Sequence, residues 1–162
     1  MWDFGNEKKA GRLANQLFEY ASLYGISKKS GQELSLPPWK YAQYFNGDFS
    51  TPDIPLFKGV NKNILADFHE QNFEYHEDYI LDSLADNKTM HRDTNFKGYF
   101  QSYKYWQRCE KEVREMLTFK EEFKQKLRAE LPTNIFDKPT IAVCIRRGDY
   151  VGNPHYYQVP IS

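Results

Sequence analysis

The apolar residues between Gly11 and Gly31 recur with helical spacing. The intervals are four, four and three residues, at Leu13, Leu17, Ala21 and Tyr24. This spacing places them on one face of a helix. Lys28 and Lys29 fall in its last turn, where they complement the negative end of the helix dipole, and Gly31 is suited to the C-cap. The first turn, which includes Asn15, exposes backbone N–H groups that can meet an anion.

Shorter strand and helix patterns follow along the chain. Strands are predicted over residues 33–36, 95–100 and 141–145, and helices over residues 41–45, 104–117 and 119–131. The last helix presents apolar residues four apart, at Phe119, Phe123, Leu127 and Leu131, and Pro132 ends it. Residues 141–145 are continuously apolar, which is typical of a strand buried on both faces of a parallel sheet. The alternation of strands and helices favours an α/β fold.

The composition limits the kinds of molecule that the chain is expected to bind. The 162 residues include 22 Lys and Arg and 22 Asp and Glu, so no overall charge attracts nucleic acid or an anionic membrane. The chain has no apolar run of the roughly 20 residues that a membrane span needs. The two cysteines and four scattered histidines lack disulfide or metal-ligand spacing. We therefore expect a cytoplasmic protein without a metal site, either freely soluble or peripheral to a bacterial inner membrane.

Aromatic residues are abundant, with 12 Tyr, 12 Phe and 3 Trp. Many lie in the segment of residues 39–60, which otherwise contains turn-forming residues. Aromatic side chains fill cores and also stack on sugars. We predict a small second core beneath a long loop, with sugar stacking as the alternative.

Two arginines, a glycine and an aspartate directly follow the apolar run 141–145. Ligands of open α/β sheets bind beyond the carboxyl ends of strands. The guanidinium groups of Arg146 and Arg147 match phosphate oxygens two at a time, and Gly148 lets the backbone turn close to a ligand. Structural ion pairs of the arginines with Asp149 or another carboxylate are the alternative. A cell-adhesion role for Arg-Gly-Asp is disfavoured, because the triplet closes an apolar strand.

Three segments carry longer motifs. They are "GRLANQLFEYASLYGISKKSG", "FKGYFQSYKYW" and "CIRRGDYVGNPHYYQ". They resemble, in this order, the Gly-x-Leu-Gly-Asn-Gln-Met-Phe-x-Tyr-Ala, Gly-Tyr-Phe-Gln-Ser-x-Lys-Tyr-Phe and His-x-Arg-Arg-Gly-Asp-Tyr motifs of the α-1,2-fucosyltransferases, glycosyltransferase family 11. The resemblance implies a GT-B-like fold. Residues 1–135 would form an N-terminal Rossmann-type domain on the acceptor side, and residues 136–162 the first strand of a truncated C-terminal GDP-fucose-binding domain.

The resemblance also implies an activity. The family moves L-fucose from GDP-fucose to the 2-hydroxyl of a galactose-terminated glycan, with inversion and without a metal. Arg146 and Arg147 would then bind the diphosphate leaving group, with Gly148 beside it. Asp149 would orient an arginine or contact the donor, and general base is the less favoured role.

The first segment also resembles the Gly-Arg-Phe-Gly-Asn-Gln segment of protein O-fucosyltransferases, whose arginine and asparagine face the donor. That match makes Arg12 and Asn15 candidate donor-binding residues. Many bacterial members of family 11 carry glycine in place of Arg12. For Asn15, the alternative is that it caps or packs the helix.

Some features depart from the family pattern. Cys144 replaces a histidine, and Ala14 replaces a glycine where the backbone would need a positive φ or a close approach to the sugar. Family members are also much longer. We therefore expect a fragment with weak or no activity alone, whose apolar run 141–145 is exposed for lack of neighbouring strands. A non-catalytic carbohydrate- or nucleotide-binding remnant is the alternative.

Overall fold

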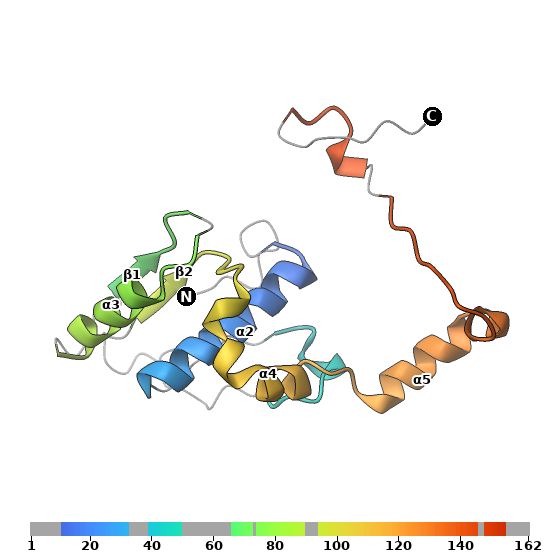
Figure 1. Ribbon diagram of the computed structural model, residues 1–162, viewed down its shortest axis with the longest axis horizontal. Helices are drawn as coiled ribbons and strands as arrows, with labels where there is room; N and C mark the ends of the chain where they lie inside the picture. Colours follow the sequence, from blue (N-terminus) through green and yellow to red (C-terminus); the bar gives the residue numbers. More distant parts are fainter. Residues whose placement is uncertain are drawn as a thin grey trace. The chain divides into compact units, whose positions relative to one another are not determined.

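A computed structural model describes residues 11–32, 39–49, 66–72, 74–89, 94–145 and 148–154 (Figure 1). The chain divides into two compact units, residues 1–123 and 124–162, each of which is described by itself. The predicted strand over residues 33–36 lies outside the described residues. The predicted domain boundary after residue 135 stays a prediction.

A small parallel sheet forms one layer of the first unit. Strand β1, Ala66–His69, pairs in parallel with β2, Thr94–Lys97, and Phe68 lies opposite Phe96. Helix α3, Glu77–Thr89, connects the two strands, which makes a β–α–β unit of the kind that builds α/β folds. The sequence pattern predicted β2, although longer, and missed both β1 and α3.

Helix α2, Leu13–Ser30, is the longest described helix. It ends as predicted, because Gly31 adopts a left-handed φ of 65° and its N–H donates to the Ser27 carbonyl oxygen at 2.9 Å. The predicted face was wrong in part. Leu13 and Leu17 are half-buried, whereas the core residues are Tyr20, Ala21, Leu23 and Ile26.

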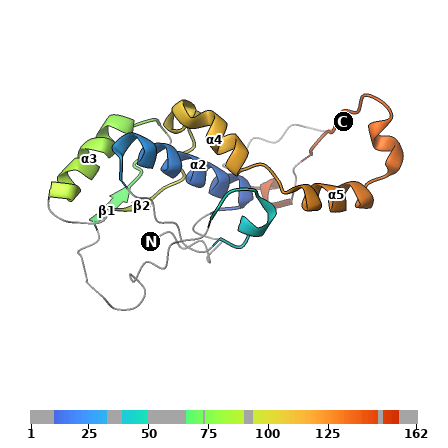
Figure 2. The same ribbon diagram turned by 90° about the horizontal axis from the view of Figure 1, so that it is seen from below.

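Helix α2 is buried on several sides because it contacts separate apolar clusters. One cluster joins it to the β–α–β unit and contains Leu23, Ile26, Phe68, Ile80, Leu84, Phe100 and Tyr105. The second joins it to the segment of residues 39–49 and contains Tyr20, Trp39, Phe45 and Phe49. In both views α2 runs beside α4, Glu110–Met116 (Figures 1 and 2).

The aromatic segment forms core, as predicted for its described part. The rings of Trp39 and Phe45 stack with their centroids 5.3 Å apart, and the ring of Tyr20 lies 4.5 Å from that of Trp39. The predicted helix over residues 41–45 is a 3₁₀ turn, Ala42–Tyr44. Residues 50–60 lie outside the described part of the chain.

The predicted helix over residues 104–117 is broken into two 3₁₀ turns, Tyr103–Tyr105 and Gln107–Cys109, followed by α4. These turns place the backbone of Tyr105 directly against Gly25 of α2. A Cβ atom at Gly25 would overlap the Tyr105 carbonyl oxygen. Close packing of the two segments therefore depends on a glycine in the middle of a helix, where it otherwise costs about 1 kcal/mol relative to alanine.

A buried ion cluster ties the C-terminal half of α2 to α3. The Glu77 carboxylate accepts two hydrogen bonds from Arg108, at 2.8 and 2.9 Å, one from Lys29 at 2.6 Å and one from Tyr75 at 2.7 Å. Burial alone would raise the pKa of Glu77, but these donors outweigh it and lower that pKa to about 2. Glu77 is consequently a buried charge whose hydrogen-bonding capacity is met.

Helix α5, Glu121–Glu130, leads into the second unit and contains no buried residue. The predicted apolar face is therefore not covered at Leu127 and Leu131, which are exposed. Beyond α5 lie two 3₁₀ turns, Thr133–Phe136 and Gly148–Tyr150. None of the described helices is both long enough and apolar enough to cross a membrane.

The prediction of a buried strand over residues 141–145 is wrong for this structure. The segment belongs to no strand, and Ile141, Val143 and Ile145 are 89%, 76% and 62% exposed. A strand of a parallel sheet is stabilised by pairing on its edges and by cover on its faces. The described residues provide neither for this segment. Its exposure is what the sequence predicted for a strand without neighbours.

Candidate active site

The start of α2 is held in place by a buried amide. Gly11 has a left-handed φ of 70°, and its carbonyl oxygen accepts a hydrogen bond from Gln16 Nε2 at 2.8 Å. Gln16 Oε1 in turn accepts from Trp39 Nε1 at 2.8 Å. Arg12 follows Gly11 in extended conformation as the N-cap residue, and its side chain makes no capping hydrogen bond. This arrangement presents Arg12 at the exposed end of the helix.

Asn15 connects this helix start to a segment far away in the sequence. Its Oδ1 atom accepts a hydrogen bond from Gln101 Nε2 at 2.9 Å, across 86 positions of the chain. Its side chain also lies where a Cβ atom of Gly11 would be, so only glycine fits there. Asn15 therefore joins the first two motif segments, and its described role is in packing and orientation rather than helix capping.

The second motif segment turns sharply at Phe100, which has a positive φ of 47°. A non-glycine residue in this conformation is strained and needs support from its surroundings. Glu70, directly after β1, accepts from the N–H groups of Tyr99 at 2.6 Å and Phe100 at 3.1 Å. Ser22 of α2 donates to the Phe100 carbonyl oxygen at 2.8 Å. These contacts fix the turn that carries Gln101.

One group beneath this turn lacks such support. Glu19 of α2 is fully buried, and neither of its carboxyl oxygens has a hydrogen-bond partner. Burial, and secondarily the negative charge of Glu70, raise the pKa of Glu19 to about 9. Glu19 is therefore protonated and neutral at pH 7.

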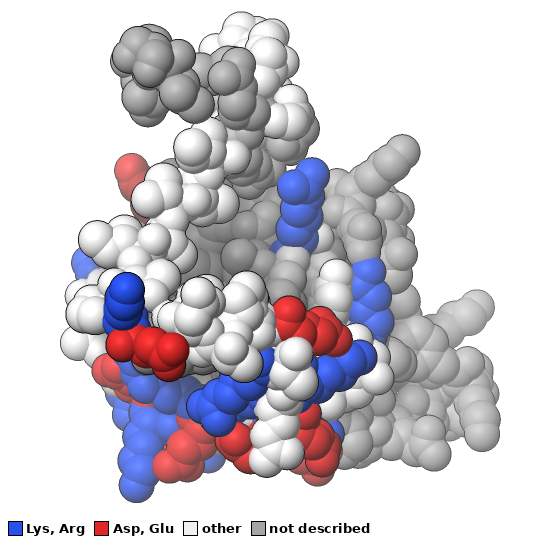
Figure 3. Space-filling model, turned by 90° about the vertical axis from the view of Figure 1, so that its right-hand side faces the viewer, with Lys and Arg blue, Asp and Glu red and all other residues white. Residues whose placement is uncertain are grey.

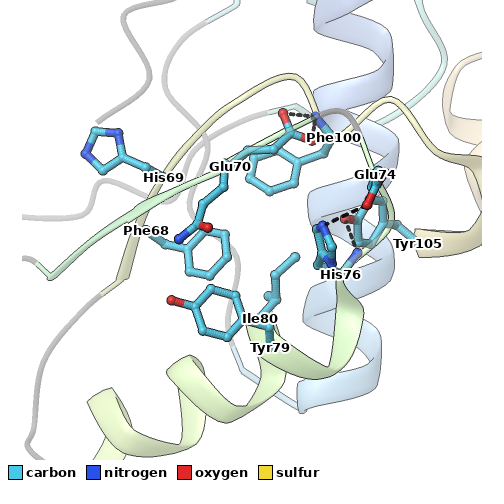
Figure 4. A pocket seen from close by; sticks show the side chains of 10 residues that line it. Phe68, His69, Glu70, Glu74, His76, Tyr79, Ile80, Phe100 and Tyr105 are labelled. Carbon is cyan, nitrogen blue, oxygen red and sulfur yellow. Dashed lines mark hydrogen bonds and ion pairs between the residues drawn. The ribbon is translucent and has the colours of Figure 1, made fainter.

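A pocket opens at the carboxyl end of β1, beside the same turn (Figure 4). Its volume is about 300 Å³. The described residues that line it are Phe68, His69, Glu70, Gln71, Glu74, His76, Tyr79, Ile80, Phe100 and Tyr105. Two of the lining residues contact the middle of α2, since Phe100 accepts from Ser22 and the Tyr105 backbone lies against Gly25.

The structure places the predicted site residues unevenly. Arg146 and Arg147 lie outside the described residues. Gly148 and Asp149 belong to the 3₁₀ turn of the second unit. In the first unit, Arg12 and Asn15 stand at the start of α2, and Asn15 is bonded to Gln101 of another motif segment.

Three contributors were missed from the sequence: Gln16, Glu70 and Gln101. Gln16 and Gln101 lie inside quoted motif segments, next to residues that the sequence analysis singled out, so their position was a usable signal. Glu70 carries no motif signal. Only its contact with the Phe100 turn, 30 positions away, reveals its role.

The two departures from the family motifs are both placed. Ala14 lies in the right-handed helix α2 with its side chain exposed, so this position requires no positive φ. Cys144 is a free, exposed thiol in the extended segment of the second unit. The replacement of the family's histidine by Cys144 therefore leaves the described packing intact.

Charge and metal-ligand chemistry add no second site among the described residues. No three His, Cys, Asp or Glu side chains in this part of the chain group as metal ligands. On the face drawn in Figure 3, lysines and arginines lie among aspartates and glutamates. That face therefore offers no extended surface of one sign.

Comparison with known proteins identifies a family and two relatives. The family model for Glycosyl transferase family 11 matches residues 3–159, which include all three motif segments. Two cattle (Bos taurus) proteins, Galactoside alpha-(1,2)-fucosyltransferase 2 and Galactoside 2-alpha-L-fucosyltransferase SEC1, are each 25% identical to the chain over 148 residues. These alignments cover 87% of the chain but only 40% and 37% of the relatives. No solved structure matches the chain.

The family match thus makes this α/β chain a glycosyltransferase. The chain belongs to glycosyl transferase family 11.

Proposed function

We propose that the chain is the N-terminal part of an α-1,2-fucosyltransferase. It would transfer L-fucose from GDP-fucose to the 2-hydroxyl of a terminal galactose, with inversion. The observation that carries the proposal is the hydrogen bond between Asn15 and Gln101, because it joins two motif segments 86 positions apart in a chain that the family model covers. The names of the two cattle relatives support the same donor sugar and linkage.

The proposed chemistry relies on positive charge at the leaving group. As the bond between fucose and GDP breaks, negative charge grows on the β-phosphate, and fixed donors at that oxygen lower the barrier. Arg146 and Arg147 supply these donors in the proposal, and no metal is required. Asp149 orients one of the arginines or contacts the donor sugar.

The start of α2 faces the donor in this proposal. The Arg12 guanidinium is exposed at the positive end of an 18-residue helix, so both favour an anionic ligand. Asn15 is fixed by Gln101 and Gly11, and fixed polar groups lose little entropy when a ligand binds.

The test is release of GDP from GDP-fucose in the presence of lactose, measured with the chain at high concentration. We expect a low but measurable rate. Replacing Arg146 with alanine should lower it about 10²- to 10³-fold. Arg114→Ala is the matched control, because Arg114 is an exposed arginine of α4 that pairs with Glu110 of the same helix, at 2.6 Å. It should leave the rate unchanged.

Two results would contradict the proposal. The first is equal turnover in the Arg146→Ala variant. The second is no turnover at any protein concentration. In the second case, binding of GDP-fucose or lactose would identify the chain as a non-catalytic binding remnant, and binding of neither would leave the motifs as inherited packing.

A further inference from the structure

The pocket at the carboxyl end of β1 has a lining that selects for a particular kind of ligand. Its floor is apolar, since Phe68, Ile80, Phe100 and Tyr105 are buried. Its rim is partly aromatic and polar, with Tyr79 56% exposed and Glu74 and His76 also exposed. An apolar floor with a few polar groups at the rim is the usual composition of a small-molecule site.

The charges around the pocket exclude an anion. Glu70 and Glu74 are among the described lining residues, whereas lysine and arginine are not. Arg108 and Lys29 lie nearby but are engaged by the Glu77 carboxylate, and Lys104 Nζ lies 5.5 Å from the centre of the Tyr75 ring. A nucleotide diphosphate would therefore meet carboxylates without a compensating cation.

Aromatic rings on two sides of the pocket offer apolar surface to a neutral ligand. Figure 4 shows Phe68 and Tyr79 on one side of the pocket and His76 with Tyr105 on the other, while His69 points away from the rest. The rings of Phe68 and Tyr79 lie 5.5 Å apart and are inclined by 50°. Aromatic faces pack against the apolar C–H face of a sugar, and carboxylate, amide and imidazole groups bond to its hydroxyls.

Several groups that would contact a ligand are already fixed. Glu70 is held by the backbone N–H groups of Tyr99 and Phe100. The Tyr105 hydroxyl accepts from the His76 N–H at 3.1 Å, and His76 Nε2 lies 2.9 Å from Asn72 Oδ1. Such a pre-formed lining binds at lower entropic cost than a mobile one.

We propose that this pocket binds one neutral pyranose ring of the acceptor glycan and excludes the nucleotide of the donor. Its volume of about 300 Å³ is at the lower end for small-molecule sites, which suits a single ring. The assignment to the acceptor rests on the function proposed above. The preference for a neutral sugar rests only on the pocket lining.

The test measures lactose binding to the chain by saturation-transfer NMR, with GDP as the anionic probe. Tyr79→Ala removes the exposed ring of the rim and should weaken lactose binding about tenfold, whereas Tyr79→Phe should preserve it. Tyr103→Ala is the matched control. Tyr103 is 55% exposed, belongs to the same unit and does not line the pocket. It should leave lactose binding unchanged, and none of the three variants should alter GDP binding.

The failure of this inference is distinguishable from that of the proposed function. Absence of lactose binding would overturn it, as would lactose binding that is insensitive to Tyr79→Ala or competition between GDP and lactose for the pocket. Lactose binding that depends on Tyr79 in a chain without GDP-fucose turnover would support the pocket and contradict the enzyme. Turnover that is unaffected by Tyr79→Ala at low lactose concentration would support the enzyme and contradict the pocket.

Discussion

Helix α2 contains one buried glutamate, Glu19, and contacts another, Glu77 of α3, and the two are in opposite protonation states. Near its C-terminal end, Lys29 joins Arg108 and Tyr75 around Glu77, whose pKa falls to about 2. In its N-terminal half, Glu19 is equally buried, has no hydrogen-bond partner, and has a pKa raised to about 9. Glu77 is thus a charged link between α2 and α3, whereas Glu19 is a neutral group inside the fold.

The two glutamates differ in their hydrogen-bond donors: burial raises the pKa of Glu19 unopposed, whereas donors oppose it at Glu77. Burial raises the pKa in both cases, and only Glu77 receives hydrogen bonds that reverse the shift. The unsupported carboxyl lies in the half of α2 that carries the motif residues. The supported one, Glu77 of α3, is bonded to Lys29 in the half of α2 that packs against the β–α–β unit.

The largest expected effect comes from removing the supported carboxylate. Glu77→Gln leaves Arg108 and Lys29 without their buried partner and should lower the free energy of unfolding by about 3 to 5 kcal/mol, measured by urea denaturation at pH 7. Because the pKa of Glu77 is lowered, its contribution should be present above pH 4.5 and disappear as the pH falls toward 2. The difference between wild type and variant should shrink over that range.

The exposed pair Arg114 and Glu110 provides the control for the Glu77 prediction. Both side chains lie on the surface of α4, so Glu110→Gln should cost less than about 0.5 kcal/mol. A Glu77→Gln variant as stable as Glu110→Gln would contradict the view that the cluster links α2 to α3.

A steric change where α2 packs against Tyr105 should have the next largest effect on the free energy of unfolding. Gly25→Ala places a methyl group on the backbone of Tyr105 and Trp106, which cannot rotate away, and should destabilise the chain by about 2 to 3 kcal/mol despite the better helix propensity of alanine. Gly31→Ala meets no atom within 4 Å and should cost about 1 kcal/mol, because of its left-handed φ alone. Equal costs in urea denaturation would show that α2 does not pack tightly at Gly25.

Local signals in the sequence predicted α2 well and the sheet poorly. The helical period, Lys28, Lys29 and Gly31 all act within one helix, and the structure confirms the cap. Strand β1 has only four residues and is stabilised by pairing with β2, 28 positions further on. Interactions at that distance are not visible in a local pattern.

The same limit applies to the apolar face of α2 and to the site. The sequence assigned one apolar face, but Gln16, Glu19 and Ser22 are also buried because α2 contacts clusters on more than one side. The motif resemblance identified Asn15 but not its partner Gln101, since a hydrogen bond across 86 positions depends on the folded arrangement. The extended segment 141–145 carried a strand signal, and the described structure gives it no neighbour to pair with.

The unsupported carboxyl of Glu19 should give a pH dependence of stability that is opposite in sign to that of Glu77. Because the pKa of Glu19 is raised to about 9, the folded chain holds a proton that the unfolded chain releases above pH 4.5. The free energy of unfolding should therefore decrease as the pH rises from 4.5 to 9. Glu19→Gln cannot ionise, so it should match wild type near pH 4.5 and become progressively more stable than wild type as the pH rises to 8.

Two companion variants separate ionisation from packing at this position. Glu19→Leu also removes the unsatisfied polar atoms, so it should be the most stable of the series at both pH values. Glu115→Gln, an exposed glutamate of α4, should leave the pH dependence of wild type unchanged. If Glu19→Gln instead destabilises the chain at pH 8, Glu19 is charged and paired in solution, and the contrast between the two halves of α2 does not hold.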